Sequence, residues 1–255
     1  TPAILVPWRR FVDESSYTLC LVPAGSFWMG CNATVDSQCG SDESPYHGVT
    51  LSGYYIDRTE VTVGSYAECV TAGTCTVPST YSSYCNWGVS GKTDHPVNCV
   101  TWNQAADYCE WSGGRLCTEA EWEKAARGTD GRKYPWGNET ATCDYAVMDD
   151  SSAGGNGCGT DSTWAVCGKS PAGDSPYGLC DMAGNIWEWV SDWYDSGYYT
   201  NSPASNPTGP VSGSSRVFRG GSFHYFYDSR RASNRFDVDP SAGGYFLGFR
   251  CCRPQ

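Results

Sequence analysis

The side chains best suited to chemistry gather between Arg219 and Arg235, in the stretch RGGSFHYFYDSRRASNR. A Gly-Gly-Ser turn is followed by a mixture of aromatic and charged groups, namely His224, Tyr225, Tyr227, Asp228 and Arg230. Rings that carry polar tips contact sugars and protein surfaces alike. The stretch therefore predicts a ligand-binding surface. The alternative is a strand whose alternate residues, Phe223 and Tyr225, point into the core.

No cysteine lies between Arg219 and Phe249, although the chain contains 15. This density is typical of an oxidising compartment, and the sequence has no Cys-x-x-Cys pair that would favour a metal site. The odd count leaves at least one sulfur free or bonded to another chain. We expect Cys251 and Cys252 to take different partners. The local pairs that we expect are Cys31 with Cys39, Cys69 with Cys75 and Cys158 with Cys167.

Short strands and a few helices must hold this stretch in place. Alternating apolar residues predict a strand that turns at Ala24 and Gly25, and then a strand pair that turns at Ser52 and Gly53. Residues 186–194 and the segment before Gly220 also read as strands.

Helix signals are clearer than strand signals. Thr62 fits the N-cap of a helix that ends at Gly73. Two capping boxes, at residues 101–104 and 118–121, predict helices that end near Gly113 and Gly128.

Residues 131–176 are rich in Gly, Asp, Ser and Thr and predict long irregular loops, which need disulfides or ions to hold them. No repeat or change of composition divides the chain. We therefore expect an N-terminal arm over residues 1–16 and one domain over residues 17–255.

The arm contains an apolar segment, Ile4 to Val6, that could add as a strand to a sheet of its own domain or of a neighbouring copy. The second possibility predicts self-association into an extracellular assembly. The chain begins with Thr1, as it would after removal of a signal peptide or after trimming. With the cysteine content, this favours a secreted or cell-surface protein.

The bulk composition excludes some partners. A net charge of -11 and a pI of about 4.6 argue against binding to nucleic acid, which requires a basic surface. No apolar run approaches the ~20 residues needed to span a membrane.

Several blocks, in order along residues 17–253, resemble the formylglycine-generating enzyme family, also called the sulfatase-modifying-factor family. The blocks include VPAGSFWMG, HPVNCVTWNQAADYCEWSGGRLCTEAEWEKAARG, YGLCDMAGNIWEWVSDWY and RVFRGGSF…NR…LGFRCCR. The resemblance implies a single α+β domain akin to the C-type lectin fold, with short strands, a few helices and long loops. His47 and His95 lie in framework blocks, and we expect both to be structural.

The resemblance also locates chemistry that this chain lacks. Active members of the family use two cysteines after the Arg-Gly-Gly-Ser block to bind copper and to oxidise a substrate cysteine. Those positions fall on Tyr225 and near Arg230, and neither side chain replaces a soft thiolate ligand of Cu(I). We therefore expect no copper and a non-catalytic protein that binds a glycan or protein ligand, or copies of itself. The alternative is a copper-dependent oxidase that generates formylglycine in sulfatases.

A structural calcium ion is the cofactor that the resemblance implies. In DMAGNIWE, the side chains of Asp181 and Glu188 and the carbonyls of Gly184 and Ile186 match the family's ligand positions. The alternative is that Glu188 pairs with a buried arginine such as Arg219 or Arg250.

Overall fold

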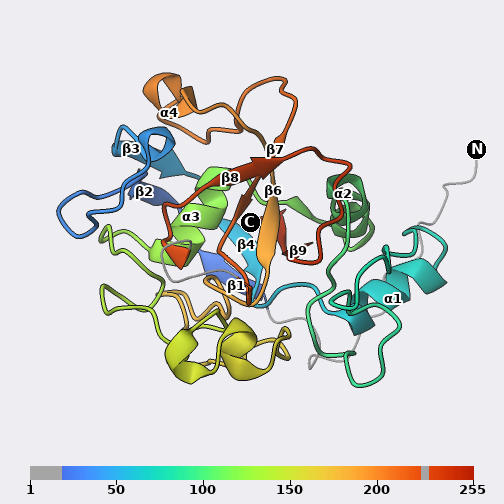
Figure 1. Ribbon diagram of the computed structural model, residues 1–255. Coiled ribbons are helices and arrows are strands. Elements are labelled where there is room, and N and C mark those ends of the chain that lie inside the picture. The colour runs from blue at the N-terminus through green and yellow to red at the C-terminus, as the bar shows by residue number, and fades with distance from the viewer. Residues whose placement is uncertain (1–18, 225–229) are drawn as a thin grey trace, which may run out of the picture.

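The computed structural model describes residues 19–224 and 230–255 (Figure 1). The expected N-terminal arm over residues 1–16 lies outside this part of the chain. Within it, short strands form three small sheets, joined by long connections and four α-helices. The α+β architecture predicted from the sequence is confirmed.

Each sheet is built from segments that are far apart in the sequence. In the first, the order is β1 (Leu19–Val22), β4 (Tyr54–Asp57), β10 (Cys251–Pro254) and β5 (Arg115–Leu116), all antiparallel. The second pairs β2 (Gly25–Met29) with β3 (His47–Leu51). The third has the order β8 (Phe236–Val238), β7 (Arg216–Arg219), β6 (Trp187–Trp193) and β9 (Leu247–Phe249), with β9 parallel to β6.

The strand pair predicted around Ser52 and Gly53 is wrong in its pairing. Both strands form, but β3 pairs with β2 whereas β4 pairs with β1 and β10. The short turn therefore carries the chain from one sheet to another. The sequence alternates similarly in both strands, so it could not show which neighbour each strand would choose.

The helices begin where the capping signals predict. They are α1 (Val63–Thr71), α2 (Trp102–Trp111), α3 (Glu119–Arg127) and the short α4 (Tyr198–Asn201). Thr62 caps α1, and both capping boxes are present at the starts of α2 and α3. Short 3-10 helices lie at Ser41–Glu43, Ser151–Ala153 and Asn156–Gly159.

Helix α3 lies at the centre of the molecule and contacts β2, β6 and β7 (Figure 1). All nine of its residues are buried, including Glu119, Glu123 and Arg127. Its Trp122 side chain is fully buried, as are the tryptophans of β6 at positions 187 and 189. Buried charged groups require partners of opposite charge. Arginine side chains pair with Glu119 and Glu123.

Seven disulfides fasten the loops to this core. The pairs Cys31–Cys39 and Cys69–Cys75 are confirmed, and Cys251 and Cys252 bond to Cys109 and Cys117 respectively. Adjacent residues of a strand face opposite sides, which sends the two neighbouring sulfurs to different partners.

The predicted pair Cys158–Cys167 is wrong. Cys158 bonds to Cys143, and Cys167 bonds to Cys180. The loop region is therefore fastened at two places, and sequence separation alone could not distinguish a single bridge from two. Cys20, in β1, is the one cysteine without a disulfide, and all 15 cysteines lie in the part of the chain that the structure describes.

Seven disulfides are typical of an extracellular or lumenal, oxidising environment. Among residues 19–224 and 230–255, no helix combines the length and the apolar character that crossing a bilayer requires.

Candidate functional site

The Arg-Gly-Gly-Ser turn follows directly after β7. Gly220 and Gly221 have φ values of 101° and 81°, a left-handed conformation that side chains other than glycine rarely adopt. A Cβ atom at Gly220 would also lie 3.1 Å from the Trp122 ring. The two glycines let the chain turn tightly against α3 and lead it to the buried Ser222.

Arg219 fixes this turn to α3 through buried ion pairs. Its two terminal nitrogens each lie 2.6 Å from a carboxylate oxygen, one of Glu119 and one of Glu123. Arg235 forms a second, bidentate pair with Glu119, at 2.7 and 2.9 Å. Burial alone would raise the pKa of Glu119, but Arg235 and Arg219 outweigh it and hold this pKa below the ordinary value.

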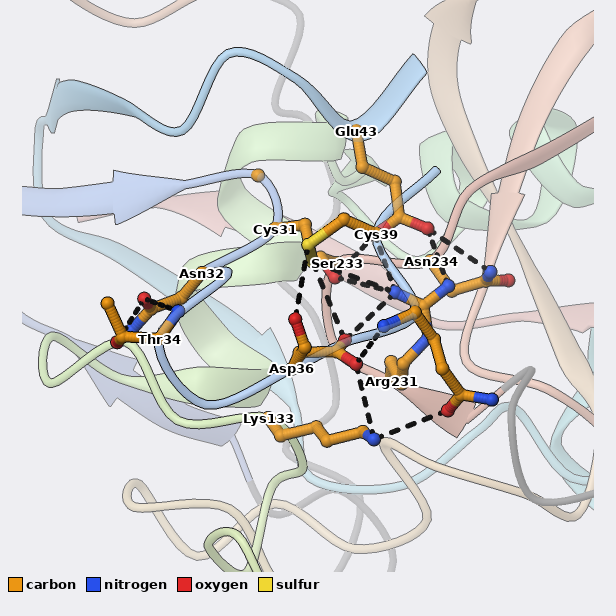
Figure 2. Close-up of a disulfide and its surroundings, with 12 residues drawn as sticks. Cys31, Asn32, Thr34, Asp36, Cys39, Glu43, Lys133, Arg231, Ser233 and Asn234 are labelled. Atoms are coloured by element: carbon orange, nitrogen blue, oxygen red, sulfur yellow. Dashed lines mark hydrogen bonds and ion pairs between the residues drawn. A yellow bond between two sulfur atoms is a disulfide. The ribbon is translucent and has the colours of Figure 1, made fainter. Parts of the chain in front are cut away.

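A second buried charge cluster holds Arg231 (Figure 2). Its guanidinium donates two hydrogen bonds of 2.6 Å to Glu43 and one of 3.0 Å to Asp36. Lys133 also pairs with Asp36, at 3.2 Å. Asp36 lies inside the loop that the Cys31–Cys39 disulfide closes. The chain on both sides of residues 225–229 is thus attached to the body of the domain by paired charges.

The candidate ligand-binding residues are only partly within the described chain. Tyr225, Tyr227 and Asp228 lie outside it. His224 is half-buried. Arg230 is buried, and it donates a hydrogen bond of 2.9 Å to the carbonyl oxygen of Ser222. Arg230 therefore contacts the turn itself.

His224 belongs to an aromatic cluster that sequence reasoning missed. Its ring centroid lies 5.5 Å from that of Tyr84 and 5.7 Å from that of Tyr245. The Tyr84 hydroxyl donates to Asp161 at 3.0 Å, and this bond raises the pKa of Tyr84. The Tyr81 hydroxyl accepts a hydrogen bond from the Tyr245 backbone, and the Tyr81 side chain is 64 % exposed. Nothing in their spacing signals that these residues meet.

The two framework histidines have structural contacts. His47 Nδ1 lies 2.8 Å from the carbonyl oxygen of Pro45. His95 Nδ1 lies 3.2 Å from Lys92 Nζ and 2.9 Å from Thr163 Oγ1. Burial lowers the pKa of His95 to about 4, so the ring is neutral at ordinary pH.

The predicted calcium turn has an unusual backbone. Asp181 and Asn185 have φ values of 54° and 60°, and Gly184 has 87°. A Cβ at Gly184 would lie 2.6 Å from the carbonyl oxygen of Val147. The buried Asp181 carboxylate accepts a 2.6 Å hydrogen bond from the backbone of Cys167. The turn thus holds the Asp181 carboxylate in the interior.

Glu188 pairs with a buried arginine, Arg250, which is the alternative that the sequence left open. Two nitrogens of Arg250 donate to its two carboxylate oxygens, both at 2.7 Å, and Trp122 Nε1 donates to one of them at 2.7 Å. Arg219, the other arginine considered, binds α3 instead.

A buried carboxylate that the sequence did not single out lies beside this turn. Glu60 is 1 % exposed, and neither oxygen of its side chain has a hydrogen-bond partner. Burial, followed by the nearby Asp181, raises the pKa of Glu60 well above its ordinary value. Burial likewise raises the pKa of Asp181 to about 6.

An unpartnered buried carboxylate fits a hard cation. Within the described ranges, no three His, Cys, Asp or Glu side chains are grouped to hold a metal by themselves, so a cation here would also need backbone oxygens.

The sequence of almost the whole chain matches a known family. The model for the sulfatase-modifying factor enzyme 1-like domain matches residues 10–255. The chain belongs to this family.

Three known proteins are similar to this chain. The formylglycine-generating enzyme of Streptomyces coelicolor is 34 % identical over 277 residues, covering 90 % of this chain and 87 % of that protein. The mouse protein named inactive C-alpha-formylglycine-generating enzyme 2 is 34 % identical over 174 residues. The match covers 64 % of this chain and 51 % of the mouse protein. The structure of PvdO from Pseudomonas aeruginosa aligns with a TM-score of 0.79 and 26 % identity, covering 93 % of this chain and 94 % of that one. The chain is therefore similar both to a named enzyme and to a relative named inactive.

Proposed function

We propose that this protein is a secreted binding module that uses the family fold without thiol-dependent oxidation. The observation that carries the proposal is the state of its cysteines. Fourteen are bonded in seven disulfides, and Cys20 is the remaining thiol. Cys20 lies on β1, in a different sheet from β7 and its turn. This arrangement supports the proposal, because a soft-metal site beside Ser222 would require two thiolates to meet there.

The binding surface that we propose combines residues 224–230 with the aromatic cluster of Tyr84 and Tyr245. Aromatic side chains supply large contact areas at a low entropic cost, and their polar tips add direction. Arg230, which is buried, would support the turn from beneath. The charge pairs of Arg219 and Arg231 would fix the two ends of the surface, because anchored ends reduce the entropy that ligand binding must remove.

A glycan and peptide array tests the binding proposal. Binding by the full chain should be abolished by Tyr225→Ala combined with Tyr227→Ala, and weakened by His224→Ala. Val211→Ala, at a fully exposed site in the connection before β7, is the control and should leave binding unchanged. Equal binding by the control and by the double variant would contradict the proposed surface.

An oxidation assay tests the competing function. A cysteine-containing sulfatase peptide, incubated with the protein, copper and oxygen, should show no formylglycine by mass spectrometry. Repeated turnover would overturn the non-catalytic proposal in favour of the copper-dependent oxidase.

We also propose a structural calcium ion at the 181–188 turn. Asp181, the carbonyls of Gly184 and Ile186, and Glu188 would hold it, and the charge of the ion would stabilise the buried carboxylates. Chelation should lower the melting temperature, and Asp181→Ala should remove that sensitivity. The same melting curve with and without chelator would contradict calcium binding.

A further inference from the structure

Strands β2 and β3 lie at the edge of the molecule and turn one face toward solvent (Figure 1). Their residues alternate between buried and exposed, and the exposed ones are Ser26, Trp28, Gly48 and Thr50. None of these four is charged, although the chain contains 28 acidic and 17 basic residues. We call them the neutral face. On a chain with a net charge of -11, such a face does not favour a charged ligand.

Trp28 is the large apolar group of the neutral face. Its side chain is 52 % exposed, and its ring stacks on the half-buried Tyr46, with centroids 5.3 Å apart and an interplanar angle of 26°. The stack holds the indole in one orientation and leaves much of its surface in contact with water. A ring that is already fixed loses little entropy when a ligand packs on it.

Gly48 leaves an open space beside this ring. It lies directly opposite Trp28 in the register of the two strands. Its φ is not positive, and a Cβ there would meet no atom of the described chain within 4 Å. Neither the backbone nor the packing therefore requires glycine at this position. A glycine inside a strand often marks a place where a ligand approaches closely.

Hydroxyl groups continue the neutral face beyond the indole. Ser26 precedes Trp28 by two residues, and Thr50 follows Gly48 by two, so both hydroxyls lie about 7 Å farther along the strands. The two hydroxyl oxygens are 2.7 Å apart, and each keeps capacity for a further hydrogen bond. The neutral face therefore offers an apolar ring followed by hydrogen-bonding groups.

A cavity of about 380 Å³ lies next to the end of this row. Ser52, two residues after Thr50, lines it together with Asn206, and the Ser52 backbone donates a hydrogen bond of 2.9 Å to the Asn206 side-chain oxygen. Of the described residues around the cavity, the charged ones are Arg115 and Glu121, and they pair with each other at 2.6 and 2.7 Å. The cavity is therefore neutral as a whole, like the face that leads to it.

We propose that the neutral face and this cavity bind a neutral oligosaccharide. One sugar ring packs the C–H groups of its flat side on the Trp28 indole, in the space that Gly48 leaves. The hydroxyls of the next ring bond to Ser26 and Thr50, and the cavity holds the end of the ligand. An anionic sugar is disfavoured because the net charge of the chain repels it.

This site is separate from the surface proposed around residues 224–230. Strands β2 and β3 form a sheet of their own, whereas the Arg-Gly-Gly-Ser turn follows β7 in another. An open face binds weakly, because few contacts offset the motion that the ligand loses. Such a ligand is removed when an array is washed, but calorimetry in solution measures it. The two binding proposals therefore succeed or fail independently.

Isothermal titration calorimetry of the full chain with cellohexaose, laminarihexaose and mannohexaose tests the proposal. At least one of these neutral hexasaccharides should bind. Trp28→Ala should weaken that binding by about tenfold or more, because a tryptophan at the centre of a contact carries a large share of its energy. Val89→Ala, at an apolar residue of similar exposure between α1 and α2, is the control and should bind like the wild type.

Gly48→Thr separates binding from a purely structural role. Threonine suits a strand and its Cβ meets no described atom within 4 Å, so the melting temperature should not fall. The new side chain fills the space beside Trp28 and should weaken binding by about tenfold or more. A lower melting temperature would mean that the fold requires this glycine, and it would count against the open space.

Three results would refute the site. The first is wild-type affinity in both Trp28→Ala and Gly48→Thr, which would place the bound sugar elsewhere. The second is the absence of binding by all three neutral hexasaccharides. The third is equally tight binding of an anionic hyaluronan hexasaccharide, because the proposal requires selection for a neutral ligand.

Discussion

Asp192 should make the protein less stable as the pH rises from 5 to 8. This carboxylate is buried on β6 and accepts hydrogen bonds of 2.9 Å from the Glu119 backbone and from the Ser191 hydroxyl. It therefore lies at the first turn of α3, the helix that carries Glu119 and Glu123. Burial, followed by the charge of Glu119, raises the pKa of Asp192 from 3.8 to about 7.

The sign and size of the effect follow from this pKa. Between the pKa of 3.8 in the unfolded chain and the pKa of about 7 in the folded chain, Asp192 holds a proton only in the folded state. The free energy of unfolding therefore decreases as the pH rises through the folded-state pKa. At pH 5, two units below a pKa of about 7, the proton contributes roughly 3 kcal/mol, because each unit corresponds to about 1.4 kcal/mol. At pH 8 this contribution has almost vanished. Asp192 alone should therefore remove roughly 3 kcal/mol between pH 5 and pH 8.

The comparison of wild type with Asp192→Asn measures this contribution. Asparagine can still accept both hydrogen bonds, but it does not titrate in this range. The free energy of unfolding is measured with denaturant at pH 5 and at pH 8. Its decrease between the two pH values should be larger in the wild type than in the variant, by roughly 3 kcal/mol. Asp107→Asn, at an exposed position on α2, should behave like the wild type. The same pH dependence in wild type and Asp192→Asn would refute the reasoning.

Three further outcomes are expected. Glu43→Gln should lower the free energy of unfolding by roughly 3 kcal/mol, because the buried Arg231 would keep only Asp36 as a charged partner. A decrease below ~0.5 kcal/mol in denaturant unfolding would contradict this. Replacing Cys109 and Cys251 by alanine should cost up to about 5 kcal/mol, because their disulfide spans 142 residues and constrains a long loop in the unfolded chain; calorimetry that shows no loss would argue against that origin. If the N-terminal arm mediates self-association, native protein should elute as a large species and deletion of residues 1–10 should return it to a monomer; an unchanged elution volume would exclude this role.

Much of the fold could be predicted locally. Capping boxes, the Thr62 cap and alternating apolar residues mark helices and strands because these signals act within a few residues. Ordered sequence blocks were sufficient to place the chain in its family. Strand partners and the bridges of Cys158 and Cys167 were missed, since they depend on how distant segments meet.

The sequence by itself determined which chemical groups are available: no cysteine between Arg219 and Phe249, and an aromatic, charged stretch after the Gly-Gly turn. Only the tertiary structure decided which groups face each other. It brought Tyr84 to His224 and left the Glu60 carboxylate buried beside Asp181 without a hydrogen-bond donor. The physical reason is that burial and charge balance are properties of a three-dimensional neighbourhood, and residues far apart in the sequence contribute to it equally.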